Sequence, residues 1–150
     1  MRGFTFKLQA VLEQRRLAER LCQRDVATAQ RRLLQVQAEI DALGAVKRTS
    51  AAELRTPAQP LSVALLAAHQ RFVLAMRQKV VALNRQMSDA RRDLDAAQSQ
   101  LIEAAKQRKV IEKLREKEEA RWAESQRRKD LIEADEVARR MQDGQTSLNA

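Results

Sequence analysis

Proline and glycine are confined to the edges of two long stretches of this sequence. Residues 4–43 and 61–143 contain neither, and the chain's two prolines, Pro57 and Pro60, lie between them. Proline costs a helix interior about 3 kcal/mol and glycine about 1 kcal/mol, so both collect where helices end. The distribution therefore predicts two long helices and one connector. At about 1.5 Å per residue the second stretch would extend over roughly 120 Å, which predicts a rod.

The composition favours a coiled coil over a globular domain. Only 3% of the 150 residues are aromatic, none is tyrosine, and 33% are charged, a balance typical of long helices. The 29 basic residues outnumber the 20 acidic ones, and the surplus lies in residues 1–100. That part of the chain is suited to an acidic partner, a nucleic acid or an anionic membrane surface.

The single cysteine, Cys22, excludes an internal disulfide and fits a reducing compartment. With no signal peptide at the start and no apolar run long enough to cross a bilayer, we expect a cytoplasmic protein.

Apolar residues recur at alternating steps of three and four in both stretches, as in a coiled-coil seam. The row in the second stretch is Leu66, His69, Val73, Met76, Val80, Leu83, Met87, Ala90, Leu94, Ala97, Leu101 and Ala104. The row in the first stretch is Leu8, Leu12, Arg15, Glu19, Cys22, Val26, Ala29, Leu33, Val36, Ile40 and Leu43. The matching steps indicate that the two helices pack on each other.

The two rows fit one antiparallel hairpin. If Leu43 lies opposite His69, then Leu8 falls opposite Ala104, where the apolar row of the second helix ends. We therefore predict an all-α fold, with two long helices in an antiparallel coiled-coil hairpin and a monomeric chain. The expected organisation is a single domain over 1–150, with helix 1 at about 5–48, a connector at about 49–61, helix 2 at about 62–143 and a polar tail at 144–150.

This register leaves the end of the second helix as a C-terminal overhang. About 35 residues, or roughly 50 Å of helix, would have no intramolecular partner. A lone helix is marginally stable in water, so we expect the overhang to fray when free and to become ordered when bound. Pairs four residues apart would add about 0.2–0.5 kcal/mol each. These pairs are Glu124 with Arg128, Asp135 with Arg139 and Glu136 with Arg140.

Several side chains are candidates for binding, each beside a simpler structural role. Trp122 lies on the expected overhang and is either a binding anchor or an incidental exposed residue. Phe72, one residue off the seam, either contacts a partner or seals the hairpin. His69 fits a polar residue that fixes the register, with a ligand or pH switch as the alternative. Phe4 and Phe6 fit a hydrophobic staple at the helix start.

The sequence lacks the constellations that catalysis requires. It contains no Gly-rich phosphate loop, no metal-ligand spacing and no nucleophile beside a base. We therefore expect no enzyme activity, no cofactor, no metal and no small-molecule substrate.

The opening residues Phe4–Leu12, with their Phe-x-Phe-Lys-Leu start, resemble the opening of the FliJ family, the flagellar protein-export stalk. The segment Glu112–Lys117 and the later Asp135–Ala138 are similar to that family's C-terminal pattern, so the resemblance covers most of the chain. The resemblance implies a cytoplasmic, non-enzymatic component at the inner face of the membrane. Its terminal end would insert into the hexameric export ATPase FliI, and its other end would contact the export gate protein FlhA and export chaperones.

The resemblance and the residue pattern together suggest sites for these partners. The expected ATPase-ring residues lie on the overhang and are Arg108, Arg115, Glu118 and Trp122. The expected gate residues, on an exposed edge at the other end, are Phe72 and Met76. Lys79 and Leu83 continue that edge but depart from the family's pattern. Two alternatives stay open: the equivalent stalk of an injectisome, and a basic coiled coil that binds nucleic acid.

Overall fold

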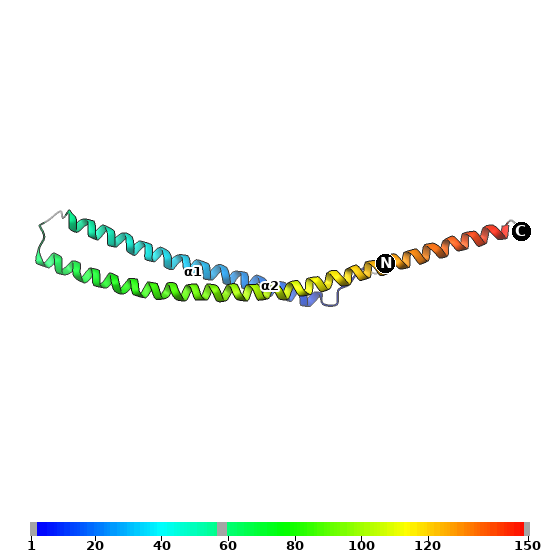
Figure 1. Cartoon of the computed structure of the whole chain (residues 1–150), viewed down its shortest axis with the longest axis horizontal. Helices are drawn as coiled ribbons and strands as arrows, with labels where there is room; N and C mark the ends of the chain where they lie inside the picture. Colours follow the sequence, from blue (N-terminus) through cyan, green and yellow to red (C-terminus); the bar gives the residue numbers. More distant parts are fainter. Residues whose placement is uncertain (1–2, 57–59, 149–150) are drawn as a thin grey trace. The chain divides into compact units, whose positions relative to one another are not determined.

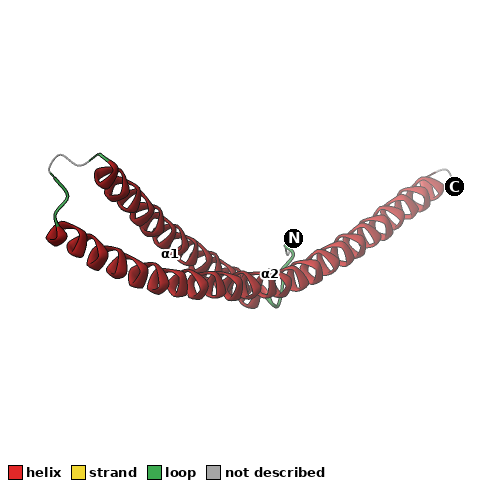
Figure 2. Cartoon of the chain, turned by 60° about the vertical axis from the view of Figure 1, so that its left-hand side comes forward, coloured by secondary structure: helices red, strands yellow, loops and turns green. Residues whose placement is uncertain are grey.

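The computed structural model describes residues 3–56 and 60–148 and, of residues 145–148, the backbone alone. It contains two helices, α1 (Gln9–Arg55) and α2 (Val63–Leu148), and no strand in the described ranges (Figures 1 and 2). The predicted all-α fold, with two helices of which the second is longer, is confirmed.

The first helix starts and ends later than the expected range of about 5–48. It starts at Gln9 because the segment before it is not helical and buries Phe6, which is only 6% exposed. Gly44 does not end the helix, since it keeps a negative φ and costs only about 1 kcal/mol there. The helix stops where Pro57 follows, because proline disfavours helical backbone at the preceding residue, Thr56.

The second helix begins close to the expected position and continues past the expected end at 143. Its start is capped by Ser62, whose Oγ accepts a hydrogen bond from the backbone N–H of Leu65 at 3.1 Å. Gly144 was expected to end the helix, but it does not adopt the positive φ of a glycine C-cap. The backbone therefore stays helical to Leu148, and most of the expected polar tail is helix.

The chain forms two compact units. One, here called the hairpin unit, comprises residues 18–104; the other, the terminal unit, comprises residues 1–17 and 105–150. In the hairpin unit α1 and α2 run antiparallel (Figure 1), and Val36, Leu83 and Met87 form a buried cluster. The predicted seam is confirmed there, since its positions are buried or half-buried except for Leu66 and Val80.

The predicted register of the hairpin is wrong by about two helical turns. His69 was expected opposite Leu43, but its Nδ1 lies 3.4 Å from the Oγ of Ser50, seven residues further along α1. Leu43 instead packs against the buried cluster. A shift of seven residues preserves the alternation of the seam and gives the imidazole a polar partner in place of a leucine. The polar register role expected for His69 agrees with this contact.

Candidate partner-binding surfaces

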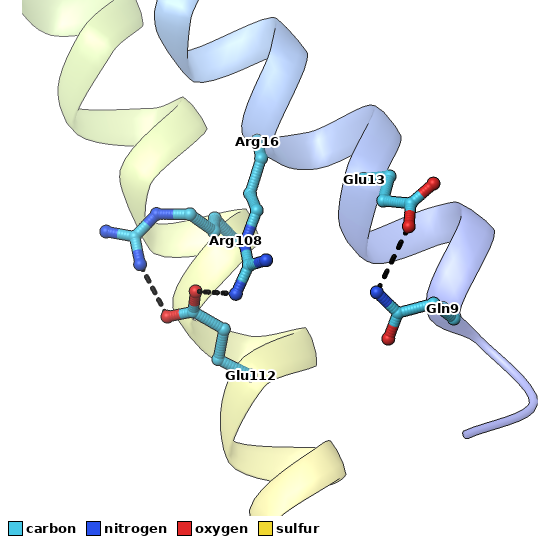
Figure 3. Close-up of polar contacts among 5 residues, drawn as sticks. All are labelled: Gln9, Glu13, Arg16, Arg108 and Glu112. Atoms are coloured by element: carbon cyan, nitrogen blue, oxygen red, sulfur yellow. Dashed lines mark hydrogen bonds and ion pairs between the residues drawn. The ribbon is translucent and has the colours of Figure 1, made fainter. Parts of the chain in front are cut away.

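A polar cluster joins the start of α1 to α2 within the terminal unit. The carboxylate of Glu112 accepts hydrogen bonds from Arg16 at 3.2 Å and from Arg108 at 2.5 Å (Figure 3). Next to it, Arg15 donates to the side-chain oxygen of Gln107 at 2.6 Å. Glu112 is 27% exposed and Arg108 is 22% exposed, so water only partly screens this cluster.

An aromatic pair lies beyond this cluster in the same unit. The ring of Phe4 packs on that of Trp122, with centroids 6.0 Å apart and planes inclined by 52°. Phe6 is buried, and Leu12 is completely buried. The expectation that Trp122 has no intramolecular partner is therefore wrong. The two phenylalanines also do more than staple the start of α1, because Phe4 reaches α2.

The four residues expected to bind the ATPase ring follow the seam of α2 instead of lying on a bare overhang. Side chains at spacings of three and four along this face are half-buried: Arg108, Arg115, Glu118 and Trp122. The expected end of coverage at Ala104 is wrong, because the terminal unit places Arg16 against Glu112 and Phe4 against Trp122. The start of α1 and the segment before it thus contact a polar continuation of the seam. The Nε of Arg115 is buried there and has no hydrogen-bond partner within the described residues.

The exposed part of α2 begins at Arg127, 23 residues after Ala104, the predicted end of coverage. Every side chain from Arg127 to Met141 is exposed; we call residues 127–141 the exposed stretch. Two of the predicted ion pairs form. Glu124, just before the exposed stretch, pairs with Arg128 at 2.5 Å, and Glu136 pairs with Arg140 at 3.9 Å. The third expected pair, Asp135 with Arg139, is not an ion pair in the structure as described. Such exposed pairs add only tenths of a kcal/mol, roughly 0.2–0.5 each.

Sequence reasoning missed an apolar stripe on this exposed stretch. Its members recur at steps of three and four and are Leu131, Ala134, Ala138 and Met141, with Val137 beside them. Leu131, Val137 and Met141 are 66%, 50% and 67% exposed. The same three–four spacing of apolar residues that predicts the seam could have revealed this stripe. The spacing is interrupted by the charged residues 127–130 and resumes at Leu131. The stretch is an amphipathic helix face with nothing from the described chain against it.

The expected gate residues lie beside a groove in the hairpin unit. Phe72 and Met76 line a space of about 460 Å³ together with Val73, Val80 and the polar pair Ser50 and His69. The rings of His69 and Phe72 lie 6.3 Å apart.

Only one of the two gate residues is accessible as expected. Phe72 is half-buried, whereas Met76 is 9% exposed and belongs to the core. The expectation of an exposed Phe72–Met76 edge is therefore wrong for Met76. That residue occupies a seam position, where α2 packs on α1.

Groups that would suggest chemistry are sparse in the part of the chain that the structure describes. There, no three His, Cys, Asp or Glu side chains are grouped closely enough to hold a metal ion. Cys22 is a half-buried free thiol on the seam. Among the described residues, no helix has the length and apolar character needed to cross a bilayer. Binding surfaces along a coiled coil are what this fold presents.

The fold and these surfaces define a two-helix coiled-coil binding protein. The sequence model of the family described as "Flagellar FliJ protein" matches residues 4–146, nearly the whole chain, and the chain belongs to this family. It is thus a component of the flagellar export apparatus, from a non-catalytic family. Searches of curated proteins and of solved structures each returned no match.

Proposed function

We propose that the chain is the stalk that couples the hexameric export ATPase, a FliI-like ring, to the FlhA-like export gate. It acts as a monomer, without enzymatic activity, at the inner face of the membrane, and it also engages export chaperones. The observation that carries this proposal is the exposed stretch of α2 in a chain of the FliJ family. A helix that presents an apolar stripe to water is stabilised when a partner covers that stripe.

The ATPase end comprises the exposed stretch and the face that carries Arg108, Arg115, Glu118 and Trp122. The exposed stretch alternates basic and acidic side chains around its apolar stripe, which suits a polar pore wall that surrounds a helix. The buried Nε of Arg115 is an unsatisfied donor in the free chain, and a partner acceptor that reached it would relieve that penalty. Trp122 and Phe4 keep this end of the stalk packed before it binds.

The gate end comprises the groove beside Phe72. Its lining is mostly apolar, with the imidazole of His69 and the hydroxyl of Ser50 at one edge, so it can accept an apolar side chain of a partner. Phe72 contacts the partner directly in this proposal. Met76, which is buried and also lines the groove, supports this site without contacting the partner in this proposal.

Truncation of the exposed stretch tests the ATPase end. A variant that stops after Gln126 keeps Glu112 and Trp122, so the terminal unit retains the contacts that Arg16 and Phe4 make with α2. We expect this variant to stay helical and to lose stimulation of ATP hydrolysis by the purified export ATPase. The matched control is Leu34→Ala, which removes an equally exposed leucine from the hairpin unit (68% exposed, against 66% for Leu131). Full stimulation by the truncated chain would place the ATPase contact elsewhere.

Substitution of Phe72 tests the gate end. Phe72→Ala should weaken binding to the cytoplasmic domain of the gate protein about tenfold, since interface aromatic residues contribute 1–2 kcal/mol or more. Helicity should change little because the side chain is only half-buried. Binding is measured by titration calorimetry, with Leu34→Ala again as the control. Equal affinity of Phe72→Ala and the unaltered chain would remove this surface from the proposal.

A further inference from the structure

The connector end of the hairpin unit is strongly basic. Residues 44–86 contain one acidic side chain, Glu53, and seven basic ones. All seven are exposed: Lys47, Arg48, Arg55, Arg71, Arg77, Lys79 and Arg85. None of the ion pairs in the described ranges involves them, since those pairs use arginines 16, 32, 92, 108, 128 and 140. The positive charge here is therefore not neutralised within the described chain.

The same end carries a second apolar stripe, separate from the seam. Val63, Leu74 and Val81 are separated by eleven and seven residues, which places them on one face of α2. They are 85%, 58% and 54% exposed. Arg71 and Arg77 lie on either side of this face by their positions in the helical repeat. Three further leucines near the helix start are also exposed at 42% to 53%: Leu61, Leu65 and Leu66.

We propose that this connector end of the hairpin unit binds directly to the surface of an anionic lipid bilayer. Exposed aliphatic side chains flanked by arginine and lysine are the features by which a helix lies in a membrane interface. The apolar stripe enters the headgroup boundary, and the seven basic side chains attract anionic headgroups. The stripe does not include Phe72 or Met76, but Val81 and Arg77 also line the proposed gate groove, so the lipid contact adjoins the gate contact.

The apolar stripe favours a lipid surface over a nucleic acid. Phosphate-backbone binding needs the basic residues but gains nothing from exposed Val63, Leu74 and Val81. Single-strand binding relies on aromatic residues that stack on bases, and Phe72 is the only aromatic residue of the Phe, Tyr and Trp class between positions 44 and 86. Binding to a lipid surface therefore depends on the exposed aliphatic side chains, whereas binding to a nucleic acid does not.

Cosedimentation of the full chain with lipid vesicles tests this proposal. The chain should bind vesicles of phosphatidylcholine mixed with phosphatidylglycerol and should not bind phosphatidylcholine alone. Leu74→Glu combined with Val81→Glu should lower partitioning about tenfold or more, because both the apolar area and the net charge decrease. Leu131→Glu is the control, since Leu131 is comparably exposed (66%, against 58% for Leu74 and 54% for Val81) but lies on the exposed stretch of the terminal unit. Circular dichroism checks that each variant remains helical.

Three results would overturn the proposal. The first is equal binding to neutral and anionic vesicles, and the second is equal loss of binding in Leu131→Glu. The third is vesicle binding that the combined Leu74→Glu and Val81→Glu variant retains in full and that duplex DNA abolishes by competition. That result would assign the basic end to nucleic acid. Because the assay contains no export protein, failure here does not affect the ATPase and gate proposals.

Discussion

At the scale of single residues, Glu112 contributes more than any exposed ion pair of the chain. It accepts hydrogen bonds from two arginines on different helices, and both it and Arg108 are largely removed from water. We predict that Glu112→Gln lowers the free energy of unfolding by about 1 kcal/mol, since hydrogen bonds to charged groups exceed surface ion pairs. Glu124→Gln should lower it by about 0.3 kcal/mol, because that pair is exposed on one helix.

Urea denaturation of both variants measures this difference. A double-mutant cycle of Glu112→Gln with Arg16→Gln should show non-additive effects, since the two side chains share a hydrogen bond. Equal destabilisation by the two single glutamate substitutions would show that the Glu112 cluster does not link the helices.

The aromatic pair offers a direct optical test, because Trp122 is the only tryptophan of the chain. Phe4→Ala should shift its fluorescence emission to longer wavelength and increase quenching by acrylamide, since the ring that covers it is removed. The pair should contribute about 0.5–1.5 kcal/mol. Leu131→Ala, on the exposed stretch, is the control. Unchanged emission in Phe4→Ala would contradict the packing of the N-terminal segment on α2.

At the scale of the helices, the two helical glycines, Gly44 and Gly144, predict different outcomes on substitution by alanine. Gly44 lies inside α1 with a negative φ, and a Cβ there would meet only the Nη1 of Arg48 at 3.6 Å, an ordinary contact. Gly44→Ala should therefore stabilise the hairpin by about 0.5–1 kcal/mol. Gly144→Ala, near the end of α2, should leave the melting temperature unchanged, since helix ends open before the rest unfolds. Destabilisation by Gly44→Ala would indicate that α1 breaks at this position.

The seam of both helices was predictable from the sequence, but their register was not. Leu12, Val36, Leu83 and Met87 are buried where the three–four spacing placed them. A shift of one heptad leaves that spacing intact, so periodicity alone could not choose between Leu43 and Ser50 as the neighbour of His69. The sequence did contain one signal for the register: Ser50 is a polar residue that could lie beside His69, the chain's single histidine.

The candidate ATPase face was predictable in position but not in exposure. Arg108, Arg115, Glu118 and Trp122 share one face of α2, as their spacing indicates. Trp122 is covered by Phe4, which lies outside any helix in a segment that carries no periodicity to align. The end of α2 was missed for a different reason, because a glycine such as Gly144 costs too little to stop a long helix by itself.

At the scale of the whole molecule, both apolar rows are used within one chain. Among the described residues, the seam positions of α1 and α2 are buried or half-buried except Arg15, Leu66 and Val80, so little of the seam remains for a second copy. We predict a monomer at micromolar concentration, measured by sedimentation equilibrium. A stable dimer of the unaltered chain would show that the helices pair between chains.

We propose that the exposed stretch of α2 enters the export ATPase ring. A photoreactive amino acid at Val137, which is 50% exposed on this stretch, tests this proposal directly in cells with a working export apparatus. We predict a crosslink from Val137 to the export ATPase and none from the same probe at Leu34 in the hairpin unit. No ATPase crosslink from Val137, together with one from Leu34, would contradict it.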